Sequence, residues 1–211
     1  MNINSLKNST YLIATVGIIF LLILLYQFFG DNSSPYILSI EEMRKQKDYQ
    51  FQHATDSPIK ESEKAQFKGL SYFPPTENYR VKAIFTPDTG KDTLILQTKK
   101  AEKRKMLKAG ILDFELFNHK YKLSAFRNIG QAQDELFIPF KDLTSGVSTY
   151  GGGRYVETSI TNLNNIWLDF NKAYSPFCVY NESFSCPIPP TENKLAVEIF
   201  AGEKSHADLR R

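Results

Sequence analysis

Cysteine and histidine are scarce in this chain of 211 residues. It contains two cysteines, and its three histidines, His53, His119 and His206, are scattered along the sequence. Zinc sites need nitrogen and sulfur ligands at short, regular spacings such as C-x-x-C, and the chain has no such pair and no clustered histidines. We therefore expect no metal site, and no motif indicates a cofactor.

An excess of charge of one sign is also lacking. The chain has 26 lysines and arginines against 23 aspartates and glutamates, which gives a formal net charge of +3. Nucleic-acid-binding proteins carry a strongly basic balance or face, because the phosphate backbone dominates their affinity. The sequence therefore predicts no nucleic-acid partner.

Charge is missing altogether from one long stretch near the N-terminus. No charged side chain occurs between Lys7 and Asp31. At about 1.5 Å per residue, a helix over residues 11–29 reaches roughly 28 Å, close to the roughly 30 Å hydrocarbon core of a bilayer. A cleaved signal peptide is the competing interpretation, but its short apolar core and small-x-small cleavage site are absent. We expect residues 1–30 to be a transmembrane anchor, with the lipid bilayer as a partner.

The flanking charges predict the side of the membrane on which the remaining residues lie. Lys7 precedes the apolar stretch, and basic residues near a span tend to stay in the cytoplasm. This favours a single-pass protein of the inner (cytoplasmic) membrane with residues 31–211 in the periplasm, the inverse topology being the alternative. In an oxidising compartment, Cys178 and Cys186 predict a disulfide that closes a short loop. Two buried thiols or a metal ligand pair are the other possibilities for these cysteines.

The rest of the chain has the pattern of a mainly β protein. Residues 31–69 predict a linker and a helical leader, with one helix over residues 39–52 capped by Ser39 and Glu42, and a second from Ser57 to before Gly69. From residue 70 onward, apolar and polar residues alternate with period two, and no long amphipathic stretch follows any strand. Residues 70–211 therefore predict an antiparallel β-barrel or sandwich. The strands expected lie near residues 79–85, 94–96, 112–116, 121–125, 135–140, 166–170 and 195–200, with a turn at Asn118-His119.

Four motifs in the C-terminal half are similar to those of a known family. They are PFKDLTSGVSTYGGGRY at residues 139–155, LDFN at 168–171, CPIPP at 186–190 and AGEK at 201–204. With these motifs the chain resembles the bacterial family called domain of unknown function 1684, over residues 40–204. Ser175 and Phe184 depart from the asparagine and tyrosine that the family leads us to expect. The resemblance implies no activity.

The same half holds the candidate site residues. Arg154 follows three glycines and is the expected contact for an anion, with Asp169 as the carboxylate that orients it. If residues 166–171 form a strand, Asp169 and Asn171 project to one side. Each residue alone has a structural interpretation, such as a glycine-rich bend that delivers Arg154 to another segment. The candidate ligand-binding set is Tyr150, Arg154, Tyr155, Asp169, Asn171, Tyr180, Asn193 and Glu203.

Three functions fit this set. The first is a membrane-anchored domain outside the cytoplasm that binds a small molecule, peptide or glycan in a polar pocket. The second is a hydrolase that uses Asp169 and Glu203 as paired carboxylates. The third is a structural domain that contacts another envelope protein. A serine nucleophile gains no support, because Ser145 lies in Thr144-Ser145-Gly146 and not in G-x-S-x-G.

Overall fold

The computed structural model describes residues 15–21, 34–90, 93–97, 103–130, 132 and 134–205. The chain divides into two compact units, Met1–Pro35 and Tyr36–Arg211. In the first unit, residues 15–21 are helical, and the remainder of the predicted anchor lies outside the described residues. None of the helices in the described ranges has the length and apolar character needed to cross a membrane.

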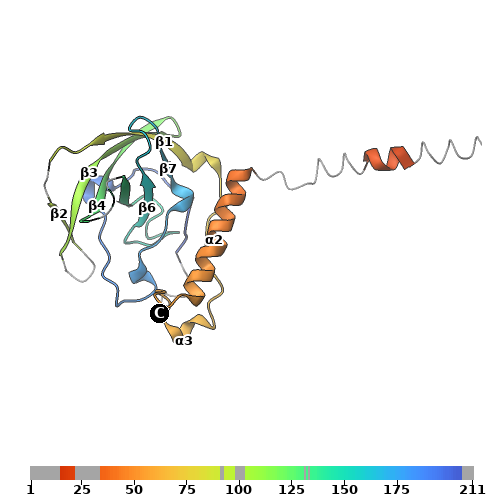
Figure 1. Ribbon diagram of the computed structural model, residues 1–211, viewed down its shortest axis with the longest axis horizontal. Coiled ribbons are helices and arrows are strands. Elements are labelled where there is room, and N and C mark those ends of the chain that lie inside the picture. The colour runs from red at the N-terminus through yellow and green to blue at the C-terminus, as the bar shows by residue number, and fades with distance from the viewer. Residues whose placement is uncertain are drawn as a thin grey trace, which may run out of the picture. The chain divides into compact units, whose positions relative to one another are not determined.

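Six strands of the second unit form a nearly closed antiparallel barrel, which confirms the mainly β prediction (Figure 1). The strands follow the order β6-β5-β4-β3-β1-β7, and β2 pairs with the same edge of β3 as β1 does. Their bounds are β1 Arg80–Pro87, β2 Thr93–Gln97, β3 Lys103–Leu116, β4 His119–Asn128, β5 Glu135–Phe140, β6 Arg154–Ser159 and β7 Ile166–Asp169.

The barrel seam lies between β6 and β7. No backbone ladder joins these two strands in the described sheet, but the Thr158 hydroxyl donates a hydrogen bond of 2.8 Å to the Trp167 carbonyl. On its other edge β7 pairs with β1, with Arg80 opposite Asp169. The seam is therefore a place where side chains rather than a continuous ladder connect the barrel wall.

Local sequence explains the central hairpin. β3 and β4 alternate apolar and polar residues, as a sheet with one buried face requires. Phe117 and Asn118 form the two-residue turn between them, with φ of 51° and 62°. The predicted turn was therefore displaced by one residue, because His119 already pairs with Leu116 in the ladder.

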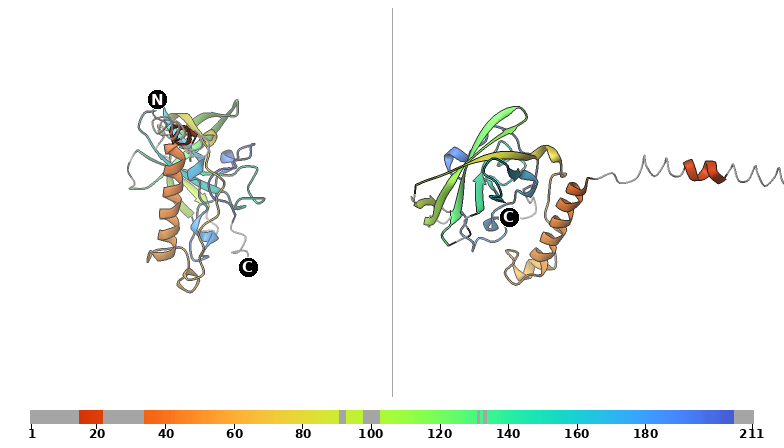
Figure 2. Two further views of the ribbon diagram at one scale, coloured as in Figure 1. Left: turned by 90° about the vertical axis from the view of Figure 1, so that its right-hand side faces the viewer. Right: turned by 45° about the horizontal axis from the view of Figure 1, so that its top comes forward.

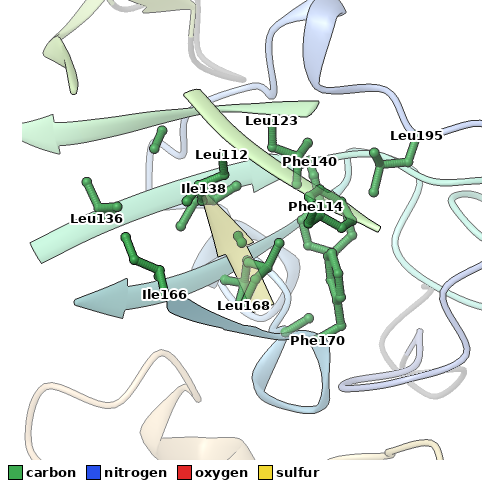
Figure 3. Close-up of a cluster of buried hydrophobic side chains, with 14 of the residues drawn as sticks. Leu112, Phe114, Leu123, Leu136, Ile138, Phe140, Ile166, Leu168, Phe170 and Leu195 are labelled. Atoms are coloured by element: carbon green, nitrogen blue, oxygen red, sulfur yellow. The ribbon is translucent and has the colours of Figure 1, made fainter. Parts of the chain in front are cut away.

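The interior of the barrel is filled by aliphatic and phenylalanine side chains from every wall (Figure 3). Strand β5 contributes Leu136, Ile138 and Phe140 to this core, while its intervening Phe137 packs in a second cluster outside the barrel. The strand is thus buried on both faces, which explains its nearly continuous apolar sequence. The labelled side chains in Figure 3 are Leu112, Phe114, Leu123, Leu136, Ile138, Phe140, Ile166, Leu168, Phe170 and Leu195.

Helix α2, Pro35–His53, lies along the outside of the barrel (Figures 1 and 2). Arg44 fixes it by donating to the carbonyl oxygens of Phe73 (2.9 Å) and Asn171 (3.3 Å). The predicted cap at Ser39 is wrong, because the helix begins at Pro35 and the Ser39 hydroxyl bonds back to the Tyr36 carbonyl. The second predicted helix is reduced to the single turn α3, Glu61–Lys64.

The segment after β7, residues 170–205, covers the barrel without forming another strand of its sheet, and we call it the covering segment. It contains the short 3₁₀ turns η2 Phe170–Lys172, η3 Phe177–Val179 and η4 Thr191–Asn193. A further 3₁₀ turn, η1 Glu77–Tyr79, precedes β1. The strand predicted at residues 195–200 is therefore wrong, since its apolar residues Leu195 and Ile199 insert into the barrel core from an irregular segment.

Candidate functional site

Arg154 lies in the protein interior and not in a pocket. It is the largest fully buried side chain among the described residues. Its guanidinium donates to the carbonyl oxygens of Ile199 (2.9 Å), Ala201 and Glu203 (3.2 Å), and Nη2 lies 3.4 Å from Asp142 Oδ2. Burial lowers the pKa of Arg154, while the carboxylates of Asp142 and Glu203 oppose that shift. The arginine therefore ties the covering segment to the barrel wall.

The predicted pairing of Arg154 with Asp169 is wrong. β5 and β6 pair with Phe140 opposite Arg154, so Asp142, two residues further on, lies within reach of the guanidinium. Asp142 Oδ2 also accepts a hydrogen bond of 2.8 Å from the Ile199 backbone nitrogen. Asp169 is at the end of β7 and has other partners.

The three glycines before Arg154 form a tight bend. Gly153 has φ of +96°, and a Cβ at this position would lie 2.6 Å from the Phe140 carbonyl oxygen. Its backbone nitrogen donates to the Tyr150 carbonyl at 3.0 Å. The bend therefore places Arg154 at the first position of β6, opposite Phe140 of β5.

Glu203 is the centre of a second buried network. Its Oε1 forms an ion pair of 2.7 Å with Lys47 of α2. Its Oε2 accepts hydrogen bonds from the Ser175 nitrogen (2.7 Å) and the Tyr180 hydroxyl (2.9 Å). Burial raises the pKa of Tyr180, and the Glu203 carboxylate adds to that shift. These contacts join the helix to the covering segment, so Glu203 and Tyr180 are engaged within the fold.

Asn193 joins the covering segment to the barrel through side-chain hydrogen bonds. Its side chain accepts from the Ser124 nitrogen (2.7 Å) and donates to the carbonyl oxygens of Ser124 (2.8 Å) and Pro139 (2.7 Å). The amide is fully buried and its donors and acceptor are all used. Asn193 therefore has a structural role.

Asp169 and Asn171 come together at the end of β7, but through a turn and not along a strand, because β7 ends at Asp169 and Asn171 lies in η2. Asp169 Oδ1 accepts hydrogen bonds from the Tyr36 hydroxyl (2.8 Å) and from the Asn171 backbone (3.1 Å) and side chain (3.2 Å). Burial and the neighbouring Asp169 raise the pKa of Tyr36 well above its ordinary value. Oδ2 accepts no hydrogen bond from the residues that the structure describes, and Asp169 lines a groove.

That groove opens at the barrel seam and has a volume of about 450 Å³. Its lining combines an aromatic ring, two cations and three carboxylates. Of the eight predicted site residues, Asp169 alone contributes to it. The charged and aromatic side chains that line the seam groove are Arg80, Glu135, Glu157, Trp167, Asp169 and Lys172.

Stacking holds one of the cations of the seam groove in place. The Arg80 guanidinium carbon lies 4.3 Å from the centroid of the Trp167 ring and 4.6 Å from that of Tyr36. Trp167 remains 42% exposed, although it is the only tryptophan of the chain. Within the described ranges, neither Arg80 nor Lys172 forms an ion pair, so both cations are available to an anionic group of a ligand.

Sequence reasoning missed Arg80, Trp167 and Lys172. Arg80 lies opposite Asp169 only because β1 pairs with β7, a pairing between distant parts of the chain that alternation alone does not predict. A signal for Trp167 was present, since a lone tryptophan on the polar side of a short strand is unusual for a core residue.

Tyr155 lines a second cavity, on the outside of the barrel wall, with a volume of about 200 Å³. Tyr150 lies near the two cysteines, and burial, with a hydrogen bond to Cys178, raises its pKa. The predicted disulfide is not present. Both cysteines are buried thiols, and the Cys186 sulfur accepts a hydrogen bond of 3.3 Å from the Cys178 nitrogen, so packing and this bond close the short loop.

The described residues contain no group of histidine, cysteine, aspartate and glutamate side chains arranged to hold a metal ion. Asp169 and Glu203, the pair considered for hydrolysis, have separate partners. Asp169 lines the seam groove, whereas Glu203 lines neither of the two cavities.

Fold and site together define an antiparallel β-barrel protein with a charged, tryptophan-containing groove at its seam. The chain belongs to the family described as "Protein of unknown function (DUF1684)", whose model matches residues 65–204, and this confirms the resemblance carried by the four motifs. The chain is also similar to the solution NMR structure of an uncharacterised protein from Haloarcula marismortui. The two share 38% sequence identity with a TM-score of 0.66, over 83% of this chain and 96% of the other. No curated protein matches the chain.

Proposed function

We propose that this protein binds a small zwitterionic molecule, such as a short peptide, in the seam groove. The proposal rests on the charges of that groove, whose lining includes the cations Arg80 and Lys172 together with the carboxylates Asp169 and Glu157. Ligand sites combine an apolar surface with a few charged or polar groups that fix orientation. Here the Trp167 ring offers the apolar surface, and the two charge signs suit a ligand with both a carboxylate and an amine.

The position of the cations favours a carboxylate over a larger anion. Arg80 is held by stacking between Tyr36 and Trp167, so its planar guanidinium can make two parallel hydrogen bonds to a carboxylate. Lys172 is exposed at the start of the covering segment and can reach the same group. Asp169 Oδ2 and Glu157 then remain for the amine at the other end.

We further propose that the domain works outside the cytoplasm, attached to the inner membrane by residues 1–30. The uncharged stretch between Lys7 and Asp31 supports this part of the proposal. Helix α2 begins four residues after Asp31 and is fastened to the rest of the domain by Arg44, which donates to the Phe73 carbonyl, and by Lys47, which pairs with Glu203. A reporter fused after the C-terminus that is active only in the cytosol would be inactive if this topology is right, and its activity would refute it.

Trp167 gives a direct test of binding, since no other tryptophan contributes to the fluorescence. The full-length chain, kept in solution with a non-ionic detergent, is titrated with dialanine and with its acetylated, amidated form, which has no charges. Dialanine is expected to change the fluorescence saturably, with the capped form at least about fivefold weaker, because each charged contact contributes roughly 1 kcal/mol or more. Equal binding of the two forms would contradict the proposal.

A matched pair of lysines supplies the control. Lys172→Ala removes a cation of the seam groove, whereas Lys194→Ala removes another exposed cation, one that lines neither cavity. The first variant is expected to weaken dialanine binding several-fold and the second to leave it unchanged. A purely structural domain would show no saturable fluorescence change in either protein.

A further inference from the structure

We propose that the second cavity is an aromatic cage that binds a small quaternary or methylated ammonium ion. The cavity lies between the outer face of β5 and β6 and the covering segment that folds back over them. Its volume of about 200 Å³ suits a trimethylammonium group with a short substituent. The eleven residues that line this aromatic cage include five aromatic rings and one carboxylate, those of Phe137, Tyr155, Glu157, Tyr174, Phe177 and Phe184.

Strand geometry brings the barrel part of the aromatic cage together. Tyr155 and Glu157 are two residues apart in β6 and so project to the same face, and Phe137 of β5 pairs directly with Glu157. Tyr174 joins them through a two-way bridge, in which the backbones of Tyr155 and Tyr174 exchange hydrogen bonds of 2.9 Å. The covering segment is therefore fixed against the barrel where the cavity opens.

The rings meet as adjoining walls. Tyr155 stands at 66° to Phe137 and at 87° to Tyr174, with centroid distances of 4.7 and 5.7 Å. Phe177 and Phe184 meet at 81° with centroids 5.4 Å apart. Aromatic faces carry negative electrostatic potential, and several rings at large angles to one another surround a cation in the cages that recognise quaternary ammonium groups.

The charge of the cage lining is negative. Glu157 is the one charged side chain among the residues that line it, and it accepts a 2.7 Å hydrogen bond from the Tyr174 hydroxyl. Lys47 is the nearby cation, 4.6 Å from the centroid of the Tyr174 ring, but its charge is balanced by Glu203 at 2.7 Å. Within the described residues no cation forms an ion pair with Glu157, so the cavity has an anionic edge.

Methylation of the ligand follows from the hydrogen-bonding capacity of the walls. A primary ammonium group has three N–H donors that need acceptors, whereas a quaternary ammonium has none. Three of the five rings, those of Phe137, Phe177 and Phe184, have no hydrogen-bond acceptor, so most of the aromatic wall offers ring faces only. An ammonium surrounded by methyl groups loses the least by leaving water for such a lining.

Choline and its neutral isostere 3,3-dimethyl-1-butanol provide a test that depends on charge alone. The full-length protein, in a non-ionic detergent without choline headgroups, carries carbon-13 in its methionine methyl groups. The chain has three methionines, of which Met106 lines the cage, while Met43 lies in α2 and serves as the internal reference. Choline is expected to shift the Met106 signal saturably and to bind at least about tenfold more tightly than the isostere. Equal binding of the two, or no shift with choline up to roughly 50 mM, would overturn the proposal.

Three variants locate the binding site. Glu157→Gln and Phe184→Leu should each weaken choline binding by about threefold or more, while Glu135→Gln, which removes a carboxylate of the seam groove only, should not. An unchanged Met43 signal shows that each variant is folded. Choline affinity that survives both cage substitutions, or that falls equally in Glu135→Gln, would refute the site.

Two further comparisons identify the ligand and separate the two cavities. Phosphocholine should bind more weakly than choline, because its phosphate would approach Glu157, and equal or tighter binding would refute Glu157 as the counter-charge. The Lys172→Ala variant should bind choline at least as tightly as the wild-type protein, because Lys172 does not line the cage and its removal takes a positive charge from the groove that Glu157 borders. Loss of choline binding in that variant would instead place the cation in the seam groove and overturn the cage.

Discussion

At the scale of single residues, charge burial separates structural from ligand-binding side chains. Arg154 and Asp142 are both fully buried, and the guanidinium also holds three carbonyl oxygens of the covering segment. Arg80 instead keeps its guanidinium at a groove, between two aromatic rings. The same side-chain type thus fastens the fold in one place and is available to a ligand in the other.

This contrast predicts different effects of one substitution. Arg154→Lys replaces a planar guanidinium, which contacts four oxygens, with a compact ammonium that has three donors, so buried acceptors lose their hydrogen-bond partners. We expect a loss of about 2–4 kcal/mol in the free energy of unfolding, measured by urea denaturation. Arg80→Lys should cost less than about 1 kcal/mol, because its site is solvated, but should weaken dialanine binding. Equal stability of the two variants would contradict the structural role of Arg154.

Sequence reasoning identified Arg154 as special but misassigned its role. The three preceding glycines correctly indicated a constrained backbone, yet the same pattern fits a cradle for an anion and a bend into the core. What decides between them is the carbonyl oxygens of residues 199–203, which reach Arg154 only in the folded chain. Contacts of this range follow from topology, and local patterns do not contain them.

At the scale of an element, the glycine-rich bend at residues 151–153 offers a matched comparison. Gly153 has φ of +96° and a Cβ there would lie 2.6 Å from a carbonyl oxygen, whereas a Cβ at Gly151 would lie 3.4 Å from its nearest neighbour. Gly153→Ala should therefore lower the unfolding free energy by about 2 kcal/mol or more, and Gly151→Ala by less than about 1 kcal/mol. Thermal denaturation of both variants checks this, and a Gly153→Ala protein as stable as wild type would show that the bend can relax.

Strands were predicted better than helix ends and irregular segments. The strand at residues 135–140 was predicted with its observed bounds, because apolar residues and flanking turns mark it clearly. Helix α2 begins four residues earlier than its apparent cap at Ser39, because Tyr36 in its first turn donates a hydrogen bond to Asp169 and stacks on Arg80. Residues 195–200 have strand-like sequence but insert into the barrel singly, which burial explains and periodicity does not.

At the scale of the whole molecule, the mainly β barrel could be predicted and its seam could not. Alternation fixes which residues face inward, but the pairing of β1 with β7 decides which strands remain unpaired. Both cavities depend on that arrangement, since they lie beside β6, where the covering segment meets the open side of the barrel. Glu157 borders both of them and is therefore the one side chain through which the two proposed ligands would affect each other.

The burial of tyrosine side chains predicts how the stability of the molecule responds to high pH. Among the described residues, burial raises the pKa of the five tyrosines Tyr36, Tyr72, Tyr150, Tyr174 and Tyr180, and carboxylates next to four of them add to the shift. In the unfolded chain all of them lose their protons near pH 10. Because the folded state then binds more protons than the unfolded state, stability is complete below about pH 10 and falls as the pH rises further.

Alkaline titration should therefore proceed in two stages. In the first stage the five buried tyrosines should keep their protons, and the far-ultraviolet circular dichroism of the barrel should stay unchanged. In the second stage the phenolate absorbance of these five tyrosines should appear together with loss of that circular dichroism, since they ionise when the chain unfolds. A single ionisation of all tyrosines near pH 10 in a protein that stays folded would show that water reaches these hydroxyls, and the buried connections between α2, the covering segment and the barrel would then have to be looser than the structure shows.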